Sequence, residues 1–149
     1  MDNDERINQL METMNSMNRI TSDYVASLNP MEIFVFGSNR AGFHGGGAAA
    51  MAHMYFGAIW GQGVGLQGQS YAIPTMEGGV DYVGHYVDEF IAFAKEHTEY
   101  KFLVTEIGCG IAGFTPQEIA PLFRDAVSLN NVSLPRRFWE ILNTFIDEQ

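Results

Sequence analysis

The sequence predicts one domain of the α/β class, because one local pattern occurs twice. An apolar segment of high strand propensity, residues 33–36, runs into a glycine-rich loop and then into residues 48–56, which are typical of a helix. The order recurs where residues 101–107, KFLVTEI, lead into GCGIAGF and then into TPQE, the start of another helix. In an open α/β sheet such loops gather at the carboxyl ends of the strands, where ligands bind. A length of 149 residues suits a single domain with a sizeable core.

The other elements follow from hydrophobic spacing and from breaks at glycine and proline. Residues 4–18 carry apolar side chains at intervals of three and four, which predicts an amphipathic helix. Its methionine-rich stripe packs either on the domain, the more frequent use of such a stripe, or on a second copy of the chain in a homo-oligomer. We treat residues 1–30 as an N-terminal helical extension and residues 31–149 as the main domain. Further strands are expected at 58–60, 70–74 and 131–134, helices at 80–97 and from Arg136 onward, and a short element at 23–28.

Charge is distributed unevenly along the chain. The formal net charge of −10 argues against a general nucleic-acid binder, because such proteins need a basic face. Residues 33–76 nevertheless contain no Asp or Glu and only one formal charge, Arg40, and residues 107–117 are also free of acids. All 16 glycines fall between positions 37 and 113. The glycine-rich loops are therefore arranged as if they receive an anion; the alternative is that they are buried apolar structure.

The 37–47 loop has the chemistry of a phosphate site. Glycines let the backbone approach a ligand closely, and the first turn of the following helix presents unpaired N–H groups and a partial positive charge. Phosphates bind readily in such a place. Residues 61–69, GQGVGLQGQ, indicate a second loop lined by backbone, next to the strand at 70–74.

Several familiar motifs are missing. The sequence has no GxxxxGK[ST], and the 37–47 loop lacks the GxGxxG spacing and acidic partner of a dinucleotide-binding Rossmann site. The four histidines show no metal-ligand spacing, so we expect no metal and no cofactor. The N-terminus is acidic, no apolar run is long enough to span a membrane, and the single cysteine excludes an internal disulfide. These features predict a cytoplasmic protein without a membrane partner.

Two side chains near the loops have chemical potential. His44, at the tip of the first loop, either contacts the ligand or hydrogen-bonds to the backbone. Cys109, between two glycines after a strand, is a nucleophile if a histidine activates it, but unpaired cysteines are more often small buried residues.

The two loops resemble the ligand-holding loops of macrodomains, the ADP-ribose-binding modules. In that family a strand leads to an asparagine and then to a GGGxA turn that opens a helix, and the counterpart here is VFGSN followed by HGGGAA. IGCGI at 107–111 is similar to the IGCGL loop of the branch that removes ADP-ribose from glutamate, and residues 70–75 fall where the family has its middle strand. The runs FGSNxAGxHGxGAA, GQGxGLQGxSYAIPT and IGCGxAGF are also similar to a macro-like group in bacteria and their phages. The resemblance covers about residues 31–140.

The resemblance implies a three-layer α/β/α fold around a mixed sheet, with a pocket for ADP-ribose or a related nucleotide. Asn39 would face the distal ribose, residues 45–48 would line the ribose and diphosphate, residues 108–114 would wrap the phosphates, and Asp23 is the candidate for holding the adenine. The residues expected to contact the ligand are Gly37, Ser38, Asn39, Gly42, His44, Gly45, Gly46, Gly47, Ala48, Gln67, Thr75, Gly108, Cys109, Gly110, Ile111, Ala112, Gly113 and Phe114.

The chain departs from the glutamate-specific branch at two positions. That branch uses a lysine after the middle strand and an aspartate directly after IGCGL, where this chain has Met76 and Ala112. Without an attacking amine or a proton-carrying carboxylate, that mechanism cannot run here.

Three functions follow, and the missing carboxylates favour the first. In the first, the chain is a module that binds ADP-ribose or a derived nucleotide. Alternatively it is a hydrolase of an ADP-ribosyl or phosphorylated ribose bond, in which Asn39 and His44 orient a water molecule. In the third reading it is a protein-interaction domain whose N-terminal helix recruits a partner.

Overall fold

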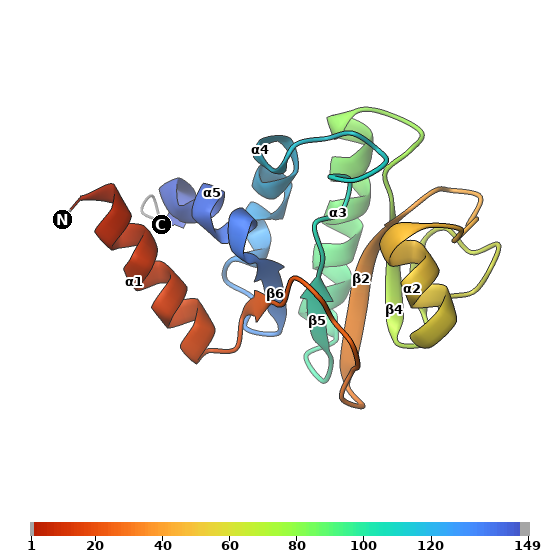
Figure 1. The fold of residues 1–149 in the computed structure, drawn as a ribbon, viewed down its shortest axis with the longest axis horizontal. Coiled ribbons are helices and arrows are strands. Elements are labelled where there is room, and N and C mark those ends of the chain that lie inside the picture. The colour runs from red at the N-terminus through yellow and green to blue at the C-terminus, as the bar shows by residue number, and fades with distance from the viewer. Residues whose placement is uncertain (1, 147–149) are drawn as a thin grey trace.

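The fold is organised around one six-stranded sheet (Figure 1). The computed structural model describes residues 2–146, apart from the side chain of Phe145. In spatial order the sheet runs β1-β6-β5-β2-β4-β3, and it is mixed because β3 runs antiparallel to β4 while the other neighbouring pairs are parallel. The strands are β1 (Ile20–Thr21), β2 (Glu32–Ser38), β3 (Gly65–Gln67), β4 (Ser70–Pro74), β5 (Lys101–Val104) and β6 (Val132–Pro135).

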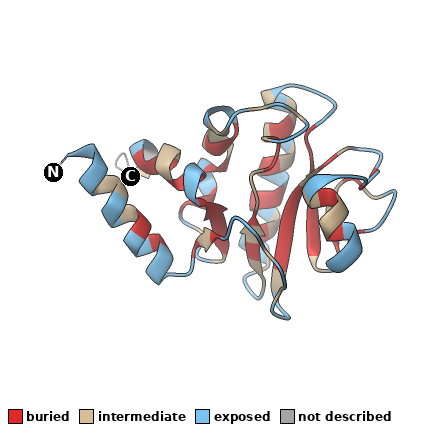
Figure 2. Ribbon diagram, in the orientation of Figure 1, coloured by how far each residue is buried: buried red, intermediate tan, exposed pale blue. Residues whose placement is uncertain are grey.

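Helices cover both faces of the sheet, so the expected three-layer α/β/α fold is confirmed. Helix α2 (Gly47–Tyr55) lies on one face, and α3 (Val80–Glu96), α5 (Arg136–Ile146) and the 3₁₀ helix at Ala120–Ala126 lie on the other. Side chains along β2 point alternately to the two faces of the sheet. Ile33 and Val35 belong to the core beneath α3, whereas Phe34 and Phe36 pack with α2, so each face needs a covering helix. Both faces of β2 and β4 are therefore buried, as the red ribbon in Figure 2 shows.

Several helices and strands are confirmed where hydrophobic spacing predicts them from the sequence. β2, β4, β6, α3 and α5 form where the spacing predicts them. The short helix α4 (Pro116–Ile119) begins with the expected capping box, in which the Thr115 hydroxyl accepts from the backbone N–H of Glu118 and the Glu118 carboxylate accepts from that of Thr115.

Two expectations about short elements are wrong. Residues 58–60 are not a strand, and the short strand of that region is β3, which pairs with β4. Residues 23–28 are irregular, and the element before β2 is β1, which pairs with β6 at the edge of the sheet. Strands of two or three residues are too short to give a periodic signal, and both depend on partners far away in the sequence.

The N-terminal residues are built into the core of the domain. Helix α1 (Asn3–Ser16) buries Met11 and Met14 in the same cluster as α5. Arg19 is 2% exposed, its guanidinium donates to the carbonyls of Ala126, Val127 and Val132, and it lies 4.9 Å from the centre of the Trp139 ring. Helix α1 and Arg19 therefore pack in the same core as α5 and β6, while assembly through residues 4–18 stays a prediction.

Candidate functional site

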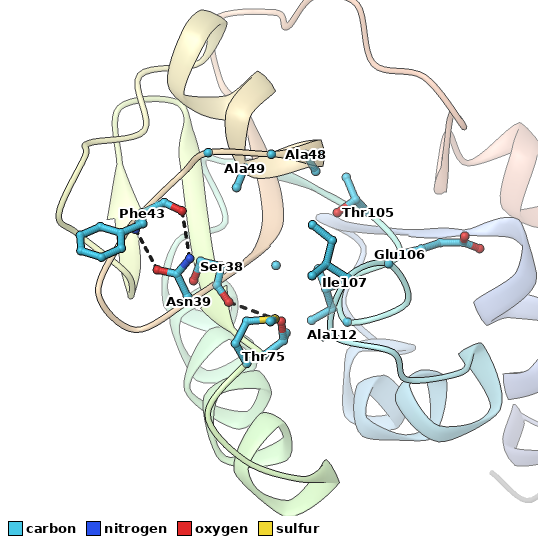
Figure 3. Close-up of a pocket in the computed structure, with 18 residues that line it drawn as sticks. Ser38, Asn39, Phe43, Ala48, Ala49, Thr75, Thr105, Glu106, Ile107 and Ala112 are labelled. Carbon is cyan, nitrogen blue, oxygen red and sulfur yellow. Dashed lines mark hydrogen bonds between the residues drawn. The ribbon is translucent and has the colours of Figure 1, made fainter.

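A cavity of about 340 Å³ opens where β2 and β5 end (Figure 3). We call it the first cavity, and its volume falls within the range of small-molecule sites. Its walls are the loop between β2 and α2 and the loop after β5, with residues that follow β4 on a third side. The lining residues are Gly37, Ser38, Asn39, Phe43, Gly45, Gly46, Gly47, Ala48, Ala49, Thr75, Met76, Thr105, Glu106, Ile107, Gly108, Gly110, Ile111 and Ala112.

The first wall presents the N-terminus of α2. Gly46 is the N-cap and has no side chain, so no side-chain hydrogen bond caps the helix. The N–H groups of the first turn, from Gly47 to Ala49, have no partner within the helix and lie along the cavity. Their N–H dipoles give this wall a partial positive charge.

The second wall presents unpaired backbone donors as well. Gly108 turns the chain with φ +73, and the loop then folds back so that the N–H of Phe114 donates to the carbonyl of Gly108. Within residues 2–146, the N–H groups of Gly110, Ile111 and Ala112 donate to no protein acceptor. A Cβ built on Gly46 would lie 3.8 Å from Ile111 Cδ1, so the tips of the two loops approach each other across the cavity.

The loop at 61–69 supports the site without lining it. A Cβ on Gly63 would lie closer than 3.0 Å to the carbonyl oxygens of Asn39 and Arg40, and a Cβ on Gly42 closer than 3.0 Å to the backbone of Gln62. The N–H of Gly61 donates to Gly42 O at 2.9 Å. Residues 39–43 and 59–63 are thus interlocked loops, held backbone to backbone at these glycines.

Polar side chains at the rim of the cavity hydrogen-bond to the backbone of the surrounding loops. The Asn39 side chain binds both backbone groups of Phe43: Oδ1 accepts from N at 2.8 Å, and Nδ2 donates to O at 2.9 Å. The Ser38 hydroxyl donates to Gly63 O at 2.6 Å, and the Thr75 hydroxyl donates to Ser38 O. These three side chains line the cavity as expected, and each already has a partner in the protein (Figure 3).

His44 and Gln67, which are among the expected ligand contacts, do not line the first cavity. Each is 2% exposed. His44 Nε2 lies 2.9 Å from Ile59 O and 3.3 Å from Gln67 Oε1, so it acts as a donor, and Gln67 Oε1 also accepts from the N–H of Ile59. The two side chains link the interlocked loops from beneath. Of the two roles considered for His44, the structure therefore shows the hydrogen bond to the backbone.

Four other expected contacts also lie outside the lining. Gly42 is buried against Gln62, and Gly113 lies beyond the turn with φ +83. Phe114 packs against the core. Cys109 is half-buried, and burial together with the nearby Glu106 carboxylate raises the pKa of its thiol to about 11, which disfavours a nucleophilic role.

Glu106 lines the first cavity but is not among the contacts expected from the sequence. It is the only ionisable side chain among the residues lining the first cavity, and it lies just before the acid-free loop. The Arg137 guanidinium donates to both of its carboxylate oxygens at 2.7 Å, and these bonds raise the pKa of Arg137. Its position directly after a strand at the carboxyl edge of the sheet was the signal that could have identified it.

A second cavity of about 360 Å³ adjoins the first. The two share four lining residues, Gly47, Ala48, Thr105 and Glu106. The remaining wall of the second cavity combines the apolar Val25, Phe34, Met51 and Pro135 with Thr21, Ser22, Asp23 and Tyr24. Asp23, the candidate for holding the adenine, therefore lines a cavity that shares Gly47 and Ala48, at the start of α2, with the first cavity.

Comparison with known proteins adds no family. No family model, no curated protein and no solved structure matches the chain. In the part of the chain that the structure describes, no helix is long and apolar enough to cross a bilayer. Over the same residues, no group of three His, Cys, Asp or Glu side chains is arranged to hold a metal ion.

Proposed function

We propose that this chain binds ADP-ribose or a closely related ADP-ribose-derived nucleotide. One observation carries the proposal: backbone N–H groups without a protein acceptor line two opposite walls of the first cavity. They belong to the first turn of α2 on one wall and to residues 110–112 on the other. A diphosphate is the ligand group that satisfies both walls at once, because its oxygens are strong acceptors and carry negative charge. The macrodomain resemblance of the same two loops supports this choice.

The second cavity suits the base of such a ligand. Phe34, Met51 and the exposed Tyr24 provide apolar and aromatic surface, and the Asp23 carboxylate can accept from an exocyclic amino group.

The charge of Glu106 is compatible with an anion because Arg137 offsets it. The ion pair is bidentate and links a residue that lines both cavities to the first turn of α5. The cavity wall is then close to neutral, and the backbone N–H dipoles dominate the local field.

The hydrolase alternative has less support. Asn39 and His44 are the residues proposed to orient a water molecule, but both amide atoms of Asn39 are bound to Phe43 and His44 is buried beneath the loops. The two positions where the glutamate-specific branch has a lysine and an aspartate, Met76 and Ala112, line the cavity and carry no titratable group. The site therefore favours binding over bond cleavage.

Isothermal titration with ADP-ribose, followed by analysis of the nucleotide recovered, tests the proposal. We expect a dissociation constant in the micromolar range or below, about −8 kcal/mol or better, and unchanged ligand. Gly110→Val places its side chain in the open space of the cavity, and Gly46→Val places one against Ile111 across the cavity, so both should abolish binding. Gly79→Ala, whose Cβ meets open space outside both cavities, should bind normally. Absence of heat and of thermal stabilisation at millimolar ADP-ribose would refute the assignment, and release of a new product would favour the hydrolase.

A further inference from the structure

An exposed aromatic pair lies at the rim of the first cavity. The rings of Phe43 and Trp60 are 60% and 53% exposed, and they stack with centroids 5.8 Å apart and an interplanar angle of 21°. Phe43 also lines the cavity. Two large rings held parallel in solvent form a surface that matches another planar ring.

Contacts from below fix the backbone of Phe43 and pack against the ring of Trp60. The Asn39 side chain clamps both backbone groups of Phe43, and the interlocked loops fix residues 39–43 against 59–63. Beneath Trp60, the rings of His53 and His44 meet it edge-on, with centroids 5.6 and 6.4 Å away. Exposed side chains ordinarily gain nothing from such fixed positions, whereas a preorganised surface binds a ligand at a lower entropic cost.

The pair stands at the end of the site opposite the second cavity. In Figure 3, Phe43 lies on one side of the first cavity, and Thr105 and Glu106, which also line the second cavity, lie on the other. A base in the second cavity and a diphosphate in the first would therefore direct the far end of the ligand toward Phe43 and Trp60.

We propose that the ligand carries a second planar ring beyond its distal ribose, which stacks on Phe43 and Trp60, so that the preferred ligand class is a dinucleotide rather than ADP-ribose itself. The proposal rests on the proposed function for the diphosphate and the first base. A positively charged ring is favoured further, because the faces of Trp and Phe attract cations and the chain carries a net charge of −10.

NAD⁺ and ADP-ribose form a matched pair of probes, because they differ by the nicotinamide ring. Titration of the full chain should give NAD⁺ an affinity about tenfold or more above that of ADP-ribose, the usual gain for stacking one ring on an aromatic side chain. Trp60→Leu should remove this preference and leave the ADP-ribose affinity unchanged. Tyr55→Leu, a control that removes another exposed aromatic ring at the far end of α2, should retain the preference. Fluorescence gives a second readout, because Trp60 is exposed while the other tryptophan, Trp139, is fully buried.

The outcomes separate this inference from the function on which it rests. Binding of ADP-ribose with no preference for NAD⁺ would overturn the inference and leave the proposed function standing. A preference that survives Trp60→Leu would also overturn it, because the second ring would then bind elsewhere. Failure of both nucleotides to bind at millimolar concentration would refute the proposed function, and the inference with it.

Discussion

Gly63→Ala tests the interlocked loops that frame the site. The added methyl group would lie closer than 3.0 Å to the carbonyl oxygens of Asn39 and Arg40, which belong to the backbone and cannot rotate away. Gly63 does not have a positive φ, so the cost comes from overlap and not from a strained backbone conformation. Forcing a methyl group into a packed site costs about 1–3 kcal/mol. Displacing residue 63 would also weaken the bond from the Ser38 hydroxyl to Gly63 O, worth about 1 kcal/mol.

We therefore expect the free energy of unfolding to fall by about 2–4 kcal/mol, and Tm to fall by about 5–15 °C for a chain of this size. Urea and thermal unfolding, monitored by circular dichroism, measure both. Gly45→Ala is the matched control, because it lies in the partner loop, its φ is not positive and its Cβ would meet nothing within 4 Å. The control should stay within about 0.5 kcal/mol of the parent chain. Equal stability of Gly63→Ala and Gly45→Ala would show that the loops are not interlocked as described.

Three further predictions concern charge, burial and reactivity. Arg19→Met removes three hydrogen bonds to buried carbonyl oxygens, of which that of Ala126 keeps the N–H of Leu129 as a donor, so urea unfolding should show a loss of about 2–3 kcal/mol. Glu106→Gln removes the carboxylate shared by the two cavities and leaves Arg137 without its partner, so ADP-ribose should bind severalfold more tightly by titration, whereas Arg137→Gln should weaken binding. Cys109, with its thiol pKa raised from 9.0 to about 11, should have about a hundredfold less thiolate at pH 8 than an unperturbed thiol. Its alkylation by iodoacetamide should therefore be slow at pH 8, accelerate as the pH approaches 11, and become fast at pH 8 once urea unfolds the chain.

Elements with strong local signals could be predicted from the sequence, and those that depend on distant partners could not. The apolar run of β2, the helical spacing of α3 and the capping box of α4 are each contained within a few residues. β1 has two residues and exists because β6 lies beside it, more than a hundred positions later. The burial of Arg19 depends on long-range contacts of the same kind, with Val127 and Val132. The short polar segment around Arg19 therefore contains no local signal that this charged side chain is buried.

The candidate site was predicted in outline, since both loops and twelve of the eighteen expected contacts line the first cavity. Part of the difference has a local cause, because neighbours in a loop can point in opposite directions. Phe43 is at the rim while His44 is buried, although the sequence places both at the same loop tip. Glu106 is not among the expected contacts because the sequence pattern favours acid-free loops as the anion site, and its pairing with Arg137, thirty-one residues away, has no local signal.

The glycines show most clearly why a sequence pattern alone could not assign the site. At Gly45 and Gly110 a Cβ would meet nothing within 4 Å, so glycine there leaves open space in the cavity next to exposed backbone. At Gly42, Gly63 and Gly68 a Cβ would come within 3.0 Å of another backbone segment, so glycine there permits two backbone segments of the chain to touch. Both uses produce the same glycine-rich sequence. Substitution by alanine distinguishes them, because the first kind should change ligand affinity at constant stability and the second should change stability first.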